Sequence, residues 1–377
     1  PMLSGTADMD MVLLYMYLAV TSIASIWISI IKSWKNILLI GITGILMYSL
    51  TNIFGGVLYK YDYKYIILFT TYLISIFYML VGVWSMIKHG AETDTKDAYT
   101  TIVNSILIVG FTLSIIPTVY QSLTLALWVL VYAFTGFFVF NRTKNMSLFY
   151  LHSCIAILLL ALATSIELSG KTLVIAFAIE AAIITVASFI VTNDIKVAQR
   201  TGTLMIIPGL MSLPSLVSSS WRYEKFILHS DFFVLFIMMA LTGLLGLFYY
   251  LNTSNSKREF NSTTEFMFIV SSFYMFALIW LSSHSIIKNP DSAVFVSLFV
   301  FTTIGLTTHF YGLFNQHAGL KKYGMVVLIL VIARLILIDV WNMELLLRVI
   351  TFVVLGVMFI STTFISKREN SSTLIKS

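Results

Sequence analysis

The sequence predicts an all-α fold, a polytopic transmembrane helical bundle of about thirteen spans. Of the 377 residues 59% are hydrophobic and only 11% are charged, whereas soluble domains carry about 25% charged residues. The mean hydropathy is +0.93. The apolar runs are close to the roughly 20 residues that a helix needs to cross a bilayer core of about 30 Å. Membrane strands would be about half as long, with alternating polarity.

The expected spans follow one another with short connections. They lie at residues 11–31, 37–59, 65–87, 101–118, 123–140, 146–166, 172–192, 202–219, 231–251, 263–284, 292–314, 323–340 and 345–366. Helices are expected because hydrocarbon offers no partners to backbone N–H and C=O groups. The connections are too short for a soluble catalytic, nucleotide-binding or nucleic-acid-binding domain. We therefore expect one membrane domain at 11–366, between a short polar stretch at 1–10 and a tail at 367–377. Because the chain starts at Pro1 and not at Met, we expect a processed chain or a fragment.

The basic residues predict the orientation in the membrane. Fifteen of the 23 Lys and Arg residues lie in the tail and in the connections after the odd-numbered spans, from the first to the eleventh. Cytoplasmic connections carry such an excess. The pattern places the tail in the cytoplasm and the N-terminus outside a cell (inner or plasma) membrane. The net charge of +6 suits a membrane surface and its lipids better than nucleic acid.

The basic connections also recur at intervals of about 51 to 62 residues, each between two spans. Two interpretations stay open. One is a repeated helical hairpin, as in many polytopic families, and the other is the spacing that short connections impose on any bundle.

Two opposite charges lie inside predicted spans, Glu180 and Arg334, at similar depths below the outer surface. Charged side chains are costly there. We predict that Arg334 faces the protein interior and pairs with Glu180; the alternative is that each is neutralised separately or reaches the surface. Asp339 lies five positions after Arg334, about 140° around an α-helix, and is not expected to be the partner. Asp339 and Arg348 flank the last outer turn, where a salt bridge between them would close the hairpin.

The eighth span is interrupted by Pro208, Gly209 and Pro214. The prolines remove two helical hydrogen bonds within one span. Broken helices line substrate sites in secondary transporters. The alternative is a kinked packing helix whose serines satisfy the freed carbonyls. Asp231, after this span, lies at an outer boundary, where a solvated helix end explains it.

The remaining residue types give no catalytic or metal-binding set. His152 and His309 lie inside spans, but neither has a second histidine or a carboxylate at i+3 or i+4. We expect packing or hydrogen-bonding roles for both, and neither a metal nor a cofactor. The one cysteine, Cys154, excludes an intrachain disulfide. Without a Ser–His–Asp set or a phosphate-binding loop, an enzyme is not expected.

The last spans resemble the C-terminal signature of a large bacterial "predicted membrane protein" family, a domain of unknown function. The stretch GLKKYGMVVLILVIARLILIDVWNMELLLRVITFVVLGVMFI carries the matching residues Lys321, Lys322, Arg334, Asp339, Arg348, Phe352 and Gly356. The family more often has Lys in place of Arg334. The span around Glu180 is similar as well, with Phe177 replacing a usual tryptophan. The resemblance is best over 320–366 and weaker over 124–315.

The resemblance implies a polytopic inner-membrane protein, without an activity, substrate or cofactor. Many members are longer, which agrees with a fragment. From the residues we expect a structural or assembly component of the cell-envelope membrane, with a membrane-protein partner or a second copy of the chain. The alternative is a transporter or lipid-handling protein that uses the broken helix at 202–219 and the intramembrane charges.

Overall fold

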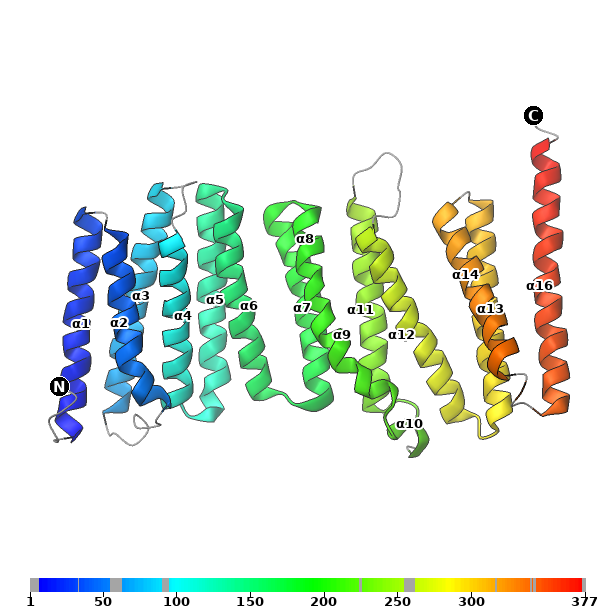
Figure 1. The fold of residues 1–377 in the computed structure, drawn as a ribbon, viewed down its shortest axis with the longest axis horizontal. Coiled ribbons are helices and arrows are strands. Elements are labelled where there is room, and N and C mark those ends of the chain that lie inside the picture. The colour runs from blue at the N-terminus through cyan, green and yellow to red at the C-terminus, as the bar shows by residue number, and fades with distance from the viewer. Residues whose placement is uncertain are drawn as a thin grey trace. The chain divides into compact units, whose positions relative to one another are not determined.

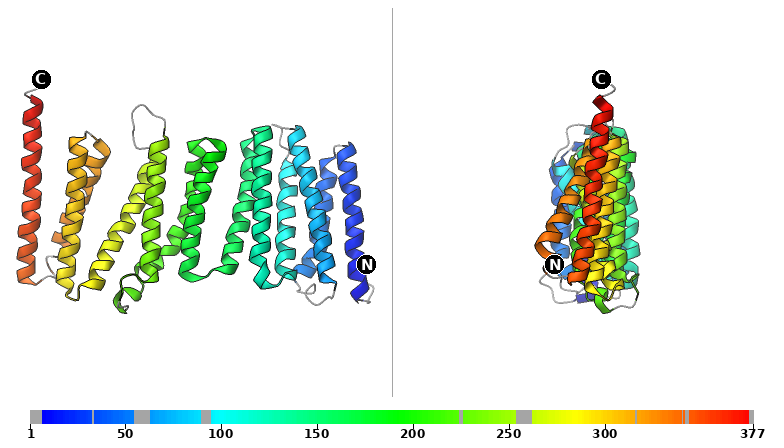
Figure 2. Two further views of the ribbon diagram at one scale, coloured as in Figure 1. Left: turned by 180° about the vertical axis from the view of Figure 1, so that it is seen from behind. Right: turned by 90° about the vertical axis from the view of Figure 1, so that its right-hand side faces the viewer.

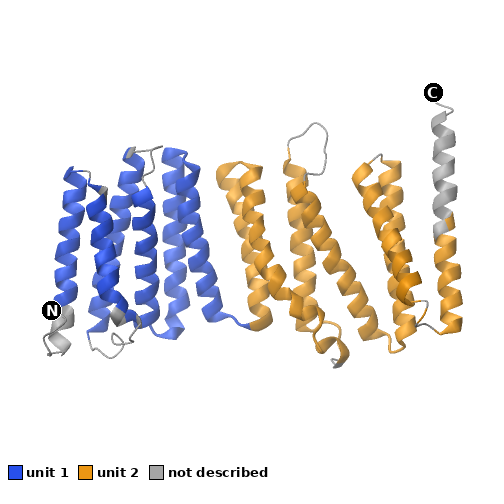
Figure 3. Ribbon diagram, in the orientation of Figure 1, with its two compact units in different colours: residues 1–169 blue, residues 170–377 orange. Residues whose placement is uncertain are grey.

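The computed structural model describes residues 7–32, 34–54, 63–89, 95–223, 226–253, 262–315, 317–339, 341 and 344–374. Over these residues the secondary structure is helical and contains no strand (Figure 1). This confirms the all-α prediction. The helices form two compact units, residues 1–169 and 170–377 (Figure 3). Each unit is described by itself.

Unit 1 consists of long helices that alternate in direction. They are α1 (Ala7–Lys32), α2 (Lys35–Phe54), α3 (Lys64–His89), α4 (Thr95–Ile115), α5 (Thr118–Thr143) and α6 (Met146–Glu167). Its core is built from large apolar side chains such as Tyr15, Ile42 and Phe111, all of which are buried.

Unit 2 combines long helices with one interrupted segment. Its elements are α7 (Gly170–Thr192), α8 (Ile195–Thr201), η2 (Gly202–Met205), α9 (Ile206–Ser212), η3 (Leu213–Leu216), α10 (Ser220–Tyr223), α11 (Ser230–Asn252), α12 (Ser262–Ile286), α13 (Pro290–Phe314), α14 (Ala318–Arg334), the π-helical turn η4 (Leu335–Asp339) and α16 (Leu345–Leu374). In two further views, the long helices within each unit run roughly along one direction (Figure 2).

The helices are long and apolar enough for a multi-pass membrane protein. Among the described residues, nine helices satisfy the length and hydropathy needed for a membrane span, and two shorter apolar helices lie at Asn36–Leu50 and Leu345–Met358. The eighth predicted span, 202–219, corresponds to the run of short helices from η2 to η3. The predicted number of spans is therefore roughly consistent with the structure.

Neighbouring helices joined by a basic connection pack against each other as hairpins, most extensively α5 with α6, α11 with α12, and α13 with α14. Two of these connections have the same geometry. Lys144 and Asn193 adopt left-handed φ angles of 55° and 52°. The next residue, Asn145 or Asp194, then accepts a hydrogen bond from a backbone N–H of the following helix, at 2.9 Å in both cases. The hairpin is thus a recurring local unit, and its origin by duplication stays a prediction.

Glycine allows the tightest of these hairpins to close. Gly324 of α14 lies against the backbone of α13, where a Cβ atom would stand 2.6 Å from the carbonyl oxygen of Gly305. Small residues at such crossings let transmembrane helices approach closely. The close approach holds α14, and the residues that follow it, against α13.

Candidate functional site: a groove beside the broken helix

The predicted break in the eighth span is present. Pro208 lies in α9 and Pro214 is the second residue of η3, after which the chain leaves the helical path at Val217. The Ser212 hydroxyl donates to the carbonyl of Gly209 (2.7 Å) and lies 2.7 Å from the Tyr274 hydroxyl of α12. The serine therefore satisfies a carbonyl at the break, as the packing alternative expects. The break also leaves the segment after η3 facing α12.

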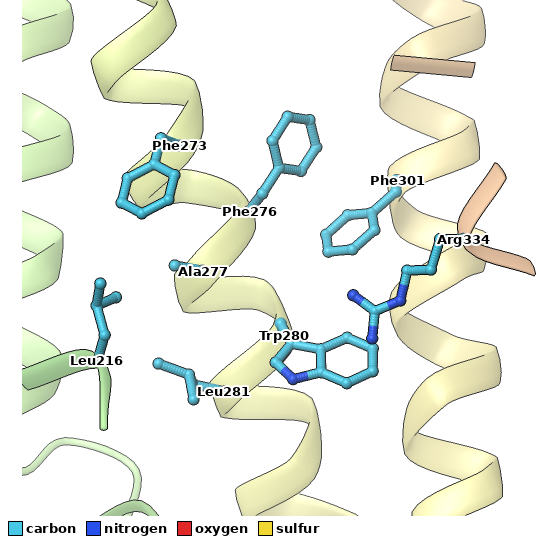
Figure 4. Close-up of a pocket in the computed structure, with 8 residues that line it drawn as sticks. All are labelled: Leu216, Phe273, Phe276, Ala277, Trp280, Leu281, Phe301 and Arg334. Carbon is cyan, nitrogen blue, oxygen red and sulfur yellow. The ribbon is translucent and has the colours of Figure 1, made fainter. Parts of the chain in front are cut away.

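Two adjoining cavities lie between this segment and α12. The apolar cavity has a volume of about 340 Å³ and is lined by Leu216, Phe273, Phe276, Ala277, Trp280, Leu281, Phe301 and Arg334 (Figure 4). The polar cavity has a volume of about 510 Å³ and is lined by Leu216, Val217, Ser218, Ser219, Trp221, Arg222, Trp280, Leu281 and His284. Because Leu216, Trp280 and Leu281 line both, the two cavities adjoin, and together they are here called the groove.

Arg334 points into the groove from the end of α14 (Figure 4). Its guanidinium carbon lies 3.5 Å from the centroid of the Trp280 ring, which is a close cation–π contact. Its Nε lies 3.3 Å from Oδ2 of Asp339, whose side chain is only 5% exposed. Arg334 therefore faces the protein, as predicted.

The prediction that Arg334 pairs with Glu180 was wrong. Its acidic partner is Asp339, five residues away, and not Glu180, which is half-buried on α7. The 140° separation assumed an α-helix, but residues 335–339 form a π-helical turn. The i→i+5 repeat of that turn places residues five apart on one face. The predicted salt bridge between Asp339 and Arg348 was also wrong, because the π-helical turn directs Asp339 to Arg334. Arg348 lies in the first turn of α16, outside the groove.

Aromatic rings shape the rest of the groove. His284 stacks on Trp280, with 3.9 Å between ring centroids, and its Nδ1 lies 2.9 Å from the Trp280 carbonyl. Trp280 thus separates His284 in the polar cavity from Arg334 in the apolar cavity. Phe276 and Phe301 meet edge to face at 4.9 Å. Their contact closes the apolar cavity between α12 and α13.

A buried ion pair fixes the wall of the polar cavity. Lys171 Nζ lies 2.6 Å from Oδ2 of Asp231, whose side chain is 1% exposed, so the expectation of a solvated helix end was wrong. His229 caps α11 by accepting from the N–H of Phe232 (3.3 Å) and packs on Trp221 at 4.3 Å. Trp221 in turn donates its indole N–H to the Ser215 carbonyl (2.8 Å). These contacts hold Trp221 in place beside the groove.

The two intramembrane histidines lie away from the groove and make hydrogen bonds. His152 Nδ1 lies 3.0 Å from the Leu148 carbonyl, and His309 Nδ1 lies 3.1 Å from the Lys321 carbonyl across the α13–α14 hairpin. In the part of the chain that the structure describes, no three His, Cys, Asp or Glu side chains gather where they could hold a metal ion. That the protein uses no metal or cofactor stays a prediction.

Sequence reasoning missed several residues of the groove. Trp280 and Phe301 lie in uninterrupted apolar runs, where an aromatic residue has no distinguishing pattern. Arg222 could have been found, because it follows Trp221 directly after a helix broken by two prolines.

Searches of protein-family models, of curated proteins and of solved structures gave no match to this chain. The resemblance to the bacterial membrane-protein family therefore stays a prediction.

Proposed function

We propose that this multi-pass membrane protein binds an anionic amphiphile in the groove, a lipid with a phosphate or carboxylate headgroup, as a lipid-handling protein or transporter. The observation that carries the proposal is that the apolar and polar cavities adjoin at Trp280, with Arg334 lining one and Arg222 the other. The volumes lie within the roughly 300–1,000 Å³ typical of small-molecule sites.

Arg334 favours a ligand-binding role over a purely structural one. Buried ion pairs contribute little net stability compared with well-packed apolar residues, so stability alone does not explain a charged pair in a predicted span. Only Nε of the Arg334 guanidinium pairs with Asp339. Within the described residues the structure assigns no hydrogen-bond partner to its terminal nitrogens, which face the groove in Figure 4. A guanidinium presents such nitrogens to phosphate or carboxylate in matching geometry.

The lining of the two cavities fits the two ends of an amphiphile. The rings of Phe273, Phe276 and Phe301 surround the apolar cavity and suit a hydrocarbon chain. The hydroxyl of Ser219 and the guanidinium of Arg222 line the polar cavity and can donate hydrogen bonds to a headgroup. A transporter or lipid-handling protein needs this combination, whereas an assembly component does not.

The basic connections place the groove in the outer half of the membrane in this proposal. The polar cavity lies at the C-terminal end of α12, opposite the basic connection that precedes this helix. Single cysteines introduced at Lys144 and at Ser169 in a C154S background test the orientation, because the two positions lie at opposite ends of α6. An impermeant maleimide added to intact cells should label S169C and not K144C. The reverse pattern would contradict the orientation.

Native mass spectrometry of the purified chain tests lipid binding. After incubation with phosphatidylglycerol or phosphatidylcholine, the wild type should retain phosphatidylglycerol several-fold better. R334Q should lose this preference. R142Q is the matched control, because Arg142 also stacks on an aromatic ring, at 5.6 Å from Phe138, but lies in unit 1. Equal retention of both lipids by the wild type, or equal loss in R334Q and R142Q, would refute the proposal.

The structural or assembly role is the second candidate. It is favoured by α16, whose contacts in the structure are mainly with α13. Val349, Val353 and Val357, spaced four residues apart, expose an apolar stripe on this helix. A partner helix or a second copy of the chain could cover that stripe. Stable oligomers in lipid nanodiscs that V353N dissociates would support this candidate, and a monomer would exclude the second copy.

A further inference from the structure

Unit 1 contains three buried oxygen atoms without a hydrogen-bond partner among the described residues. They are Oγ of Ser75 on α3, Oδ1 of Asn104 on α4 and the hydroxyl of Tyr132 on α5. The three residues are at most 1% exposed. Proteins pair almost all buried polar atoms, either with protein groups or with ordered water. Three unpaired atoms on three packed helices therefore require an explanation.

The three residues lie near one another. Asn104 Nδ2 donates to the Ser75 carbonyl at 3.1 Å, which places the amide beside Ser75. This bond also fixes the amide orientation, because only the NH₂ group can donate to a carbonyl. The Tyr132 hydroxyl lies close enough to interact with the Asn104 side chain but makes no hydrogen bond of adequate geometry.

Ser75 differs from the other buried hydroxyls on the same helices. Thr71, Thr101 and Thr112 each donate to the carbonyl four residues earlier, at 2.7–2.9 Å. Such bonding back to the helix is the usual way in which a hydroxyl is satisfied in a helix interior. Ser75 makes no such bond, so its hydroxyl remains available to a group outside its own helix.

We propose that one water molecule is bound between Ser75, Asn104 and Tyr132 and joins α3, α4 and α5. Water donates two hydrogen bonds and accepts two, which matches one amide oxygen and two hydroxyls. A buried water typically makes about three hydrogen bonds. The side chains of Ser75, Asn104 and Tyr132 are neutral, which disfavours a metal ion in an apolar interior. Asp97, the acid on α4, lies two helical turns earlier, near Ser85.

Radiolytic footprinting of the full chain in nanodiscs tests this inference. Hydroxyl radicals formed from a bound water modify adjacent side chains even when these are buried. Tyr249 is the matched control, because it is also 0% exposed but its hydroxyl donates to the Ala198 carbonyl at 3.1 Å. Tyr132 should be modified several-fold faster than Tyr249, with ¹⁸O incorporated from labelled water. Equal rates for the two tyrosines would overturn the proposal.

A variant identifies the residues that hold the water. In N104L the amide is removed and its volume is filled, so modification of Tyr132 should fall to the Tyr249 level. If N104L does not fold, S75A removes one of the three groups that hold the water, and modification of Tyr132 should fall by a smaller amount. Modification of Tyr132 that persists unchanged in a folded variant would overturn the assignment of the site to these three residues.

Discussion

Arg334 and Asp339 form an ion pair across one π-helical turn, with 3.3 Å between Nε and Oδ2. On an α-helix, residues five apart face directions about 140° apart, so the pair exists because the helix changes type at Leu335. Single π-helical turns occur frequently at functional sites. Here the turn places a compensating carboxylate beside the one arginine that also stacks on Trp280 in the groove.

Replacing Asp339 by Asn should destabilise the protein by about 1–2 kcal/mol. This is less than the roughly 3–5 kcal/mol of a fully buried pair, because the Arg334 side chain is 32% exposed and keeps its cation–π contact with Trp280. Thermal unfolding in detergent measures the change. The double variant R334Q/D339N should lose less stability than the two single variants together. Strict additivity would show that the two charges are not coupled.

P214A should weaken lipid binding without unfolding the protein. An alanine at this position restores an N–H group, so that α9 can continue past Ser212 and carry Leu216 away from α12. Retention of phosphatidylglycerol in native mass spectrometry should therefore fall. P290A is the control, because Pro290 occupies the first turn of α13, where proline is compatible with a helix. Equal retention of phosphatidylglycerol by P214A and P290A would contradict a role of the helix break in shaping the groove.

The spans could be predicted from sequence because the bilayer dictates their length and composition. The span expected at 146–166 is α6, Met146–Glu167, and the one expected at 231–251 is α11, Ser230–Asn252. The break in the eighth span was also predictable, since Pro208 and Pro214 cannot donate helical hydrogen bonds.

The pairing of charges could not be predicted in this way. The π-helical turn has no sequence signal in an apolar run, so the regular helical period gave the wrong face for Asp339. Asp231 is buried because Lys171, sixty residues earlier, lies beside it in the folded unit. Contacts of this kind depend on how the helices pack, which a single span does not specify.

The Lys171–Asp231 pair should respond asymmetrically to mutation. K171M leaves a carboxylate that is 1% exposed without its cation, and this should cost about 3 kcal/mol. D231N should cost less, because the amide is neutral and Lys171, at 39% exposed, can be solvated. Chemical unfolding of both variants in one detergent makes the comparison. A larger loss of unfolding free energy in D231N than in K171M would contradict the burial of the Asp231 carboxylate.

G324A should destabilise the α13–α14 hairpin by about 1–3 kcal/mol, the usual effect of overpacking. The added Cβ would lie 2.6 Å from the Gly305 carbonyl oxygen and 2.7 Å from the Cα of His309, which are backbone atoms and cannot move aside. G44A is the control, since a Cβ on Gly44 in α2 meets nothing within 4 Å. It should be neutral or stabilising, by up to about 1 kcal/mol. Unfolding midpoints that fall equally in the two variants would contradict the close approach.

The most direct test of lipid binding in the groove is an experimental density map of the chain in nanodiscs that contain phosphatidylglycerol. We predict elongated density in the apolar cavity between Leu216 and Phe301, continuing past Trp280 to a headgroup beside Arg222. A groove filled by protein side chains, or by a helix of another chain, would contradict the account.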